Sequence, residues 1–460
     1  MTLALNGRIT LLCGLLTTSG AFAGEPLQVT LSADEYDGIC DAHCSLRDAI
    51  TAANQAGGAQ HIRLAPGNYV LSRPSLPDAN GFAGDEDDNL DGDFDVLGEL
   101  TIQGSGEEQT RIISQIESRL FEVRPGARLS LLRLSLENGR SGRNGGALEN
   151  HAELLLRQVR LDNNQVSTPH SIASPAPLAE AFDWGQGGAL ANYGNAQIYA
   201  STFQRSKAMG LYYGNNFGRG GAIFNTGVLL VRDSHFDRNS VDDQADRGHG
   251  GALYNLGTAD IARSLFTVNQ HAEMGGGGAI FNTGTGLLKL SNSTLSNNWS
   301  ALYNGYVESP SEAVPSATLI NVSIAASNGP ALVNRGEVLI RNSLMVGNYD
   351  PYESDQAADC ITYGPVSSYR AVGLLTSSPT STCTADRHET AERVFSHLLE
   401  PLADNGGLTQ TLALRPGSMA LDAGLGSCSG HDQRRQPRPL DGTGDGVAVC
   451  DLGAYERAQP

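Results

Sequence analysis

Apolar and polar positions repeat in a fixed order through the middle of the chain. The stretch from Gly218 to Asn239, GRGGAIFNTGVLLVRDSHFDRN, is one copy of the pattern. Each copy has an alanine, then Leu or Ile, and an asparagine three residues after the alanine. Seven asparagines occupy that position: Asn150, Asn192, Asn225, Asn255, Asn282, Asn304 and Asn334. Short apolar runs of period two predict strands, and glycines and asparagines at fixed offsets predict the turns between them.

The second half of each copy keeps register with the first. A polar or small residue follows at an equivalent position, with an apolar residue two before it and another three after it. The residues at this position are Gln158, Ala200, Asp233, Arg263, Asn292, Asn321 and Asn342. Six residues further on stands Asn or Ser, as at Asn239. Fixed positions separated by variable spacers predict a stack of equivalent units.

The shortest unit, from Ala279 to Ala301, is 22 residues long. This length suits one coil of a solenoid built from short strands and turns, and it is too short for a propeller blade or an α-solenoid unit. We therefore predict an all-β chain that forms a single-stranded parallel β-helix. Equivalent residues of successive coils would stack about 4.8 Å apart, so the seven asparagines are expected to form a ladder of hydrogen-bonded amides.

The repeats resemble those of a known family. The paired motifs GGAIFN with FDRN, and GGALYN with FTVN, resemble the repeats of polymorphic outer-membrane proteins over about residues 139–348. That resemblance implies a right-handed parallel β-helix, a solenoid of the pectate-lyase-like kind. It also implies an adhesin-like role, because members of this family often act as adhesins.

The N-terminal part resembles a second module. The segment CDAHCSLRDAITAANQ, residues 40–55, is similar to the module named for its CSLREA motif, with Asp48 in place of glutamate. The apolar residues at helical spacing are Leu46, Ala49, Ile50 and Ala53. They predict a short amphipathic helix that caps the β-helix and covers its exposed strand edge. Arg47 is expected to be a paired residue inside this cap rather than a catalytic one.

The C-terminal part, from about Leu402 to Glu456, is similar to the choice-of-anchor Q domain of exported β-helix proteins. The resemblance implies a secreted or surface setting. The sequence thus divides into a signal peptide (1–23), an N-terminal CSLREA-like cap (24–98), the right-handed parallel β-helix (99–359), and C-terminal coils with a cap (360–460). The charged residues expected to form a polar network within that cap are Asp422, Asp432, Arg434, Asp441 and Asp451.

Export is indicated by the N-terminus and by the cysteines. Residues 1–23 combine one positive charge at Arg8, an apolar stretch and the small residues Ala21 and Ala23, which is the pattern of a cleaved signal peptide. Six cysteines remain in the mature chain, an even number typical of disulfides in an exported protein. Six cysteines can be paired in 15 ways. Proximity in sequence favours the one that joins Cys40 with Cys44, Cys360 with Cys383, and Cys428 with Cys450. The protein would be periplasmic, cell-surface or extracellular, without a transmembrane segment in the mature chain.

The charge narrows the range of partners. The formal net charge is −19, and Lys207 and Lys289 are the only lysines. Nucleic acids and anionic membrane surfaces require basic patches, so neither is an expected partner. The sequence does not determine the oligomeric state.

A binding surface is predicted at one corner of the stack. A segment of variable length joins the Asn or Ser that ends each copy, such as Asn239, to the alanine of the next copy. This segment shortens along the chain, from 25 residues (Asn164 to Ala189) to 3 (Asn298 to Ala301). Stacked inserts build a continuous wall. Rings that cover sugar faces, together with polar groups that reach hydroxyls, are typical of glycan sites. The candidate binding residues are Asp183, Trp184, Tyr212, Tyr213, Asn216, Arg219, Asp242, Asp243, Asp246 and His249.

The favoured function is therefore a non-catalytic, adhesin-like protein that binds a glycan or another cell-surface partner. The alternative is a polysaccharide lyase or glycoside hydrolase acting on an acidic glycan, with carboxylates from Asp242, Asp243 and Asp246. The sequence carries no signature of such enzymes and identifies no catalytic residue. It also places these acids in a variable loop rather than on a strand.

One cofactor is a candidate. Asp87, Asn89, Asp91 and Asp93 stand at the alternate spacing of a calcium loop, with Gly92 at its turn. The residue at the twelfth position of such a loop is Gly98 instead of glutamate, and Asp93 could simply end a strand. No other cofactor is predicted, because no Cys/His cluster indicates zinc.

Overall fold

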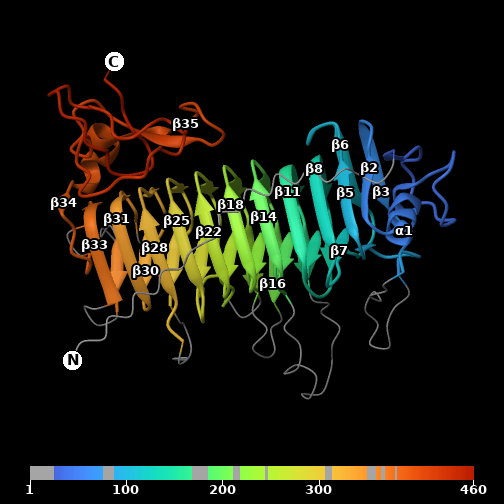
Figure 1. The fold of residues 1–460 in the computed structure, drawn as a ribbon. Helices are drawn as coiled ribbons and strands as arrows, with labels where there is room; N and C mark the ends of the chain where they lie inside the picture. The colour runs from blue at the N-terminus through green and yellow to red at the C-terminus, as the bar shows by residue number, and fades with distance from the viewer. Residues whose placement is uncertain are drawn as a thin grey trace, which may run out of the picture.

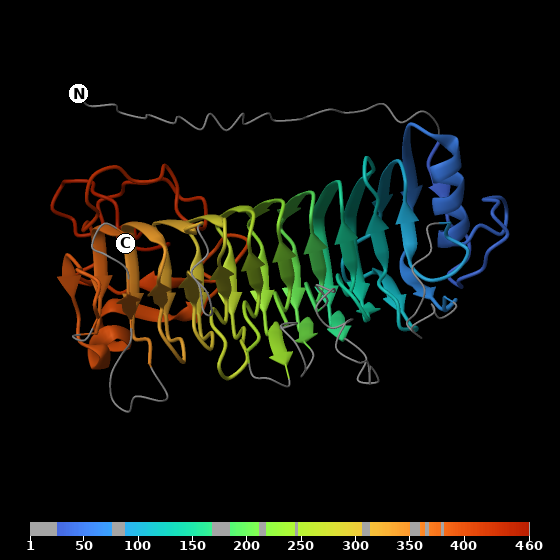
Figure 2. The ribbon, with the colours of Figure 1, turned by 90° about the horizontal axis from the view of Figure 1, so that it is seen from below.

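The structure is a computed structural model. It describes residues 25–75, 88–167, 185–210, 218–243, 247–305, 313–349, 359–363, 368–378 and 381–459. The chain forms a right-handed parallel β-helix, in which the coils stack from helix α1 (Leu46–Ala56) at one end to strands β33 (Tyr369–Thr376) and β34 (Arg387–His388) at the other (Figures 1 and 2). The prediction of an all-β solenoid with a small helical cap is confirmed.

Each coil contributes one short strand to a first parallel sheet, which has ten strands in the described part of the chain. They are β4 (Phe94–Val96), β7 (Phe121–Val123), β10 (Leu148–Asn150), β13 (Leu190–Asn192), β17 (Ile223–Asn225), β21 (Leu253–Asn255), β24 (Ile280–Asn282), β27 (Leu302–Asn304), β30 (Leu332–Asn334) and β32 (Cys360–Thr362).

The rest of each coil belongs to a second, larger sheet, of twenty strands in the described residues. Besides β33 and β34 it contains β1 (Leu27–Gln28), β2 (Ala59–Arg63), β3 (Gly67–Leu71), β5 (Glu99–Gln103), β6 (Thr110–Ser114), β8 (Arg128–Glu137), β11 (Glu153–Asp162), β14 (Asn195–Tyr199), β15 (Thr202–Gln204), β18 (Val228–Arg232), β19 (His235–Asp237), β22 (Thr258–Ala262), β23 (Leu265–Thr267), β25 (Leu287–Ser291), β26 (Thr294–Ser296), β28 (Ser316–Ile320), β29 (Ser323–Ala325) and β31 (Glu337–Val346).

The predicted asparagine ladder is present. Each amide nitrogen donates to the side-chain oxygen of the next asparagine at 2.7–2.8 Å, from Asn150 to Asn334. All seven side chains are buried. A buried amide without partners would cost roughly 1–3 kcal/mol, so the ladder satisfies polar groups that the coil turns into the interior. The interior itself is apolar, and Phe203, Phe236 and Phe266 stack at 5.0 and 4.5 Å.

The second repeated position is a corner with left-handed backbone. Its seven residues, from Gln158 to Asn342, have φ between 44° and 55°. Such φ values are uncommon outside glycine, asparagine and aspartate. Here even Ala200 and Arg263 adopt them, because every coil must turn at the same height to keep its strands in register. We call this row the left-handed corner.

The N-terminal cap holds together through one arginine. Ser45 caps the N-terminus of helix α1 in a capping box with Asp48, and the Cys40–Cys44 disulfide lies just before it. The Arg47 guanidinium is fully buried and pairs with Asp34 at 2.7 Å. The prediction that Arg47 is a paired residue of the cap is confirmed. The other two predicted disulfides, Cys360–Cys383 and Cys428–Cys450, are also present.

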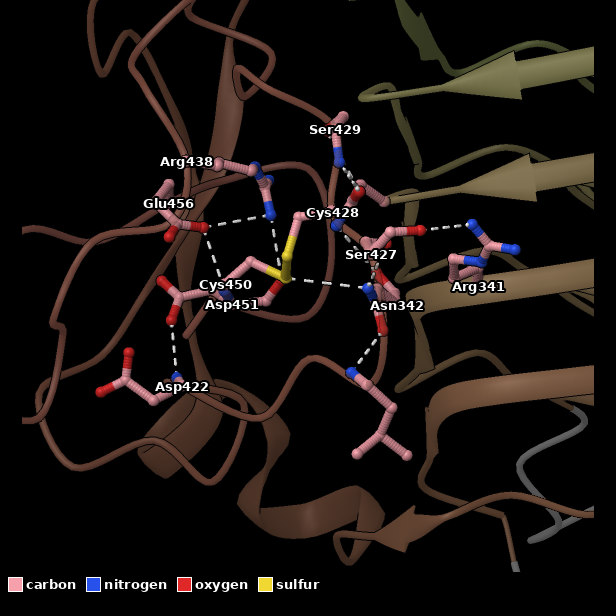
Figure 3. The surroundings of a disulfide bond; sticks show 12 residues. Arg341, Asn342, Asp422, Ser427, Cys428, Ser429, Arg438, Cys450, Asp451 and Glu456 are labelled. Carbon is pink, nitrogen blue, oxygen red and sulfur yellow. Dashed lines mark hydrogen bonds and ion pairs between the residues drawn. A yellow bond between two sulfur atoms is a disulfide. The ribbon is translucent and has the colours of Figure 1, made fainter. Parts of the chain in front are cut away.

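The C-terminal module, residues 389–459, packs along the side of the coils (Figure 1). It includes the helical turns Ala391–Arg393 and Val394–Leu398 and the antiparallel strands β35 (Leu399–Ala403) and β36 (Thr411–Leu414). Near the Cys428–Cys450 disulfide, Leu425 N donates to Asn342 Oδ1 at 2.8 Å, and Arg341 donates to Ser427 at 2.9 Å (Figure 3). The module extends back as far as Asp233, which Arg435 contacts at 2.8 Å. It therefore covers the left-handed corner over several coils.

Candidate functional site

The inserts that follow the larger sheet begin as regular strands. They are β9 (Arg140–Ser141), β12 (Gln165–Ser167), β16 (Lys207–Gly210) and β20 (Ser240–Asp243), which pair in register as a small parallel sheet. Asp242 and the backbone of Asp243 belong to β20. The interpretation that these two acids lie in a variable loop is therefore wrong. The strand is stabilised by the neighbouring coils, so its own sequence gives little sign of it.

One row of polar residues runs along this small sheet. Its members occupy equivalent positions on five successive coils: Arg140, Gln165, Lys207, Ser240 and Gln270. We call it the polar row. Arg140 donates to Gln165 at 3.2 Å, and the Lys207 ammonium lies 2.8 Å from Asp242, whose side chain is 59% exposed. The row extends over four strand spacings, or about 19 Å.

A buried apolar row lies beside the polar row and holds it in place. Val166, Ala208 and Val241 occupy consecutive positions in register and are at most 3% exposed. Alternate residues of a strand point to opposite faces, so burial of this row directs the polar row outward. The polar row is therefore fixed by packing.

A second row closes the inserts, immediately before the ten-stranded sheet. Asn144, Gln186, Arg219 and His249 form successive parallel bridges, so the structure brings the predicted residues Arg219 and His249 side by side. The Arg219 guanidinium lies 5.7 Å from the Tyr254 ring, and the His249 ring stacks on Phe281 at 4.5 Å. His249 is only 6% exposed. Burial, followed by the nearby charges of His271 and Arg219, lowers the pKa of His249 to about 3, so its ring is neutral at physiological pH.

Aromatic rings stack on the outer face of the ten-stranded sheet beside this row. Successive pairs among Tyr193, Phe224, Tyr254, Phe281 and Tyr303 have centroids 4.9–6.1 Å apart. Phe224 and Phe281 are 2% exposed and Tyr254 is 8% exposed. This column therefore serves mainly as packing. The rings predicted for sugar contact, Trp184, Tyr212 and Tyr213, lie outside the described residues, as do Asp183, Asn216 and Asp246.

The N-terminal end of the same face carries buried charges that the sequence did not single out. Asp95, Glu122 and Glu149 stand in register on β4, β7 and β10. The Arg119 guanidinium contacts Glu122 at 2.6 Å and Glu149 at 2.8 Å. Each acid belongs to a different coil, so only their stacking brings them together. We call Arg119, Glu122, Glu149 and His151 the N-terminal ion cluster.

The pKa shifts in this cluster follow from its contacts. Burial acts to raise the pKa of Glu149, but Arg119 and then the hydrogen bond from His151 outweigh it, so the net shift is downward. The Glu149 hydrogen bond in turn raises the pKa of His151 against the effect of burial. Glu149 and His151 therefore favour each other's charged forms, whereas Arg119 favours only the charged form of Glu149 and acts against protonation of His151.

The proposed calcium loop uses its described donors within the protein. The Asn89 amide exchanges hydrogen bonds with the backbone of Asp95 at 2.9 and 3.0 Å. The Arg47 guanidinium donates to four backbone carbonyls of the loop, those of Asn89, Asp91, Gly92 and Asp93, at 2.8–3.4 Å. Thus a side-chain cation already sits among the carbonyls that a calcium ion would use.

The carboxylates of the loop give no fuller donor set. Asp93 faces Arg119 at 3.5 Å, and Asp87 lies outside the described residues. Among the described residues, no group of three or more His, Cys, Asp or Glu side chains is arranged to hold a metal ion. Asn89 and Asp93 are therefore already engaged within the protein. Whether calcium binds remains a prediction for titration.

Comparisons with known proteins give the fold a limited context. No family model matches the chain, and no curated protein matches it. The chain is similar to the crystal structure of pectate lyase Pel9A, with 12% sequence identity and a TM-score of 0.43 over 94% of this chain and 97% of that one. The CSLREA-like, polymorphic outer-membrane protein-like and choice-of-anchor Q-like resemblances remain expectations. No helix in the described residues is long and apolar enough to span a membrane.

Proposed function

We propose that this protein is exported and binds an extended glycan of the cell surface along the polar row. Its three disulfides are typical of chains that fold in an oxidising compartment. The observation that carries the proposal is the register of the polar row, in which the same position on five coils presents a polar side chain. A surface that repeats along one axis is complementary to a polymer that extends along that axis.

The chemistry of the row suits sugar hydroxyls. Arg140 and Lys207 offer charged donors, Gln165 and Gln270 offer amides that donate and accept, and Ser240 offers a hydroxyl. Asp242, beside Lys207, adds an exposed acceptor. Charge-assisted hydrogen bonds are the stronger ones, so the two cations are expected to contribute most to affinity. Arg219, on the second row, would contribute to the neighbouring wall.

The two lysines give a direct test. Lys207 lies on the polar row and pairs with Asp242 at 2.8 Å, whereas Lys289 lies on β25 and pairs with Asp260 at 3.1 Å. After reductive ¹³C-methylation, each lysine gives its own NMR signal in the mature chain. We expect a glycan identified on an array to shift the Lys207 signal and leave the Lys289 signal unchanged.

Matched substitutions complete the experiment. Lys207→Ala should weaken glycan binding by about tenfold or more, the size of one hydrogen bond to a charged group. Lys289→Ala removes a comparable surface ion pair and should leave binding unchanged. Equal effects of the two variants, or a shift at Lys289 alone, would contradict the assignment.

Catalysis is the competing function, and the same preparation tests it. A lyase would release unsaturated products from an acidic polysaccharide, and a hydrolase would release new reducing ends. Product formation that is lost in Asp243→Ala but kept in Lys207→Ala would favour the enzyme. Binding without product, sensitive to Lys207→Ala, supports the proposal.

A further inference from the structure

A recess lies on a different side of the coils from the polar row. Its volume is about 490 Å³, within the range of small-molecule sites. The floor consists of the first three residues of the left-handed corner, Gln158, Ala200 and Asp233, and of Arg133, which continues the corner on the preceding coil with φ of 56°. The loop Ser105–Gln109 forms one wall, and Leu408 of the C-terminal module stands at the other. We call this recess the corner groove.

The N-terminal wall is held rigidly. Arg133 donates to the Ser105 carbonyl at 2.9 Å, and Arg160 joins Glu108 to Glu137. Gly104 allows the close approach of the loop, because a Cβ there would lie 2.5 Å from the carbonyl oxygen of Arg133. This wall is therefore pre-formed.

The opposite wall is fixed by contacts between the C-terminal module and the coils. Asp233 pairs with Arg263 and Arg435, both at 2.8 Å, and Thr409 donates to the Arg263 carbonyl at 3.2 Å. The Leu408 side chain, 64% exposed, projects at the rim. A ligand entering the groove would meet a mixed surface, with the polar Gln158 and Thr202 beside the apolar Ala200 and Leu408.

The protein itself shows what this corner binds. Further along the stack, the module covers the same row through neutral hydrogen bonds, such as that from Ser429 to Asn292 at 2.8 Å. The cover ends at Asp233, and the next three corner positions face the groove. These four positions span three strand spacings, or about 14 Å. The groove thus continues a surface that already pairs with polar groups of the module, both neutral, as at Ser429, and charged, as at Arg435.

The charges around the groove are balanced. Asp233 lies between two arginines, and Glu108 pairs with Arg160. His235 is partly buried, and desolvation lowers its pKa, so its ring is neutral at physiological pH. Within the described part of the chain, the Gln158 amide and the Thr202 hydroxyl have no intramolecular hydrogen-bond partner. Apart from Glu107 and Arg133, which also line the groove, the groups left to contact a ligand are neutral donors and acceptors.

We infer that the corner groove is a binding site for a short, neutral, hydroxyl-rich ligand, such as two or three sugar units. An anionic ligand would meet Glu107, Glu108 and Asp233 around the groove and is disfavoured. A large apolar ligand would leave the polar groups of the groove unsatisfied. This site is independent of the polar row, so either proposal can fail without the other.

The test is calorimetric titration of the full mature chain with cellotriose, xylotriose and mannotriose, and with trigalacturonate as the charged counterpart. We expect at least one of the neutral trisaccharides to bind with Kd below about 1 mM. The double variant Gln158→Ala/Thr202→Val should weaken that binding about tenfold, since it removes one to two net hydrogen bonds. Trigalacturonate should bind at least about tenfold more weakly than that neutral trisaccharide.

Controls separate folding and the first site from this one. Both substituted side chains lie at the surface, and an unchanged thermal transition of the double variant excludes misfolding. Thr202→Arg, which places a charge in the groove, should also weaken binding, whereas Lys207→Ala should not. The inference is overturned if no neutral trisaccharide binds at about 10 mM, if the double variant binds as tightly as the parent, or if trigalacturonate binds as well as the neutral trisaccharide.

Discussion

The two ends of the molecule each bury a group of charges, and they hold them in opposite ways. In the N-terminal ion cluster, Arg119 contacts the Glu149 carboxylate directly at 2.8 Å, and the pKa of Glu149 is lowered. In the C-terminal module, the Arg438 guanidinium donates to the backbone carbonyl of Asp451 at 2.9 Å, while the Asp451 carboxylate accepts backbone N–H groups (Figure 3). Burial and then the nearby Glu456 raise the pKa of Asp451 to about 7.

The comparison shows that burial alone does not decide the charge of an acid. Glu149 and Asp451 are both removed from water, and burial acts to raise the pKa of each. A guanidinium that contacts the carboxylate reverses this effect at Glu149, whereas one directed at a carbonyl does not reverse it at Asp451. We call Asp432, Arg434, Arg438, Asp451 and Glu456 the C-terminal ion cluster. Asp432, Arg434 and Asp451 belong to the network expected from the sequence, whereas Arg438 and Glu456 were not among its expected members.

The largest expected effect comes from removing Arg438. Its guanidinium is fully buried and contacts Glu456 at 3.1 Å and the carbonyls of Asp451 and Gly453. Arg438→Met leaves these groups buried without a cation, which should cost about 3–5 kcal/mol of local stability. Hydrogen exchange of residues 420–457 measures the loss. Arg232→Met, at a partly exposed ion pair with Asp260, is the matched control and should cost less than about 1 kcal/mol.

Removing Arg119 should make the N-terminal cluster behave like the C-terminal one. In Arg119→Met, Glu122 and Glu149 lose their shared cation, so the pKa of Glu149 should rise and residues 119–151 should lose about 2–4 kcal/mol of stability. NMR titration of the Glu149 carboxyl in parent and variant checks the direction. An unchanged pKa would mean that Arg119 does not control this acid.

A pH effect of intermediate size is expected in the C-terminal module. The folded-state pKa of Asp451, about 7, lies above its unfolded value of about 3.9, so the folded state binds more protons between these values. The contribution of Asp451 to stability is therefore complete below about pH 4 and is lost as pH rises toward 7, by roughly 1.4 kcal/mol per pH unit. Hydrogen exchange of residues 420–457 at pH 5 and pH 7 measures it. Asp451→Asn should remove this dependence.

The smallest expected effect belongs to His151. Its pKa is raised in the folded state, so its contribution is present below the unfolded value near 6.5 and is lost as pH rises through the folded pKa. The side chain is 33% exposed, so the effect should stay below about 1 kcal/mol. In His151→Phe, residues 119–151 should no longer lose protection between pH 6 and pH 8. If the dependence persists, another group is responsible.

Much of the fold follows from repeated local positions. The spacing of asparagines predicts the ladder, since each coil places the same residue at the same height and amides stack at the strand spacing. The disulfide pairs follow from proximity in sequence, because each joins cysteines 4 to 23 residues apart. The helical spacing around Arg47 likewise predicts the cap and the paired role of this arginine.

The candidate sites depend on contacts that the repeat does not encode. Asp242 belongs to a strand only because β16 of the preceding coil pairs with it. Glu122 and Glu149 lie 27 residues apart in sequence and meet only when their coils stack. The corner groove requires the C-terminal module to fold back so that Arg435 reaches Asp233, 202 residues earlier.

The sequence by itself thus determined the coil, the two positions that repeat in every coil, the cap and the disulfides. Periodic residues make the same short-range contacts in every unit. The tertiary structure alone decided where charges gather, which inserts become strands and how far the C-terminal module covers the left-handed corner. These features depend on non-repeating segments that pack sideways against the stack, and such packing is set by contacts between residues far apart in the chain.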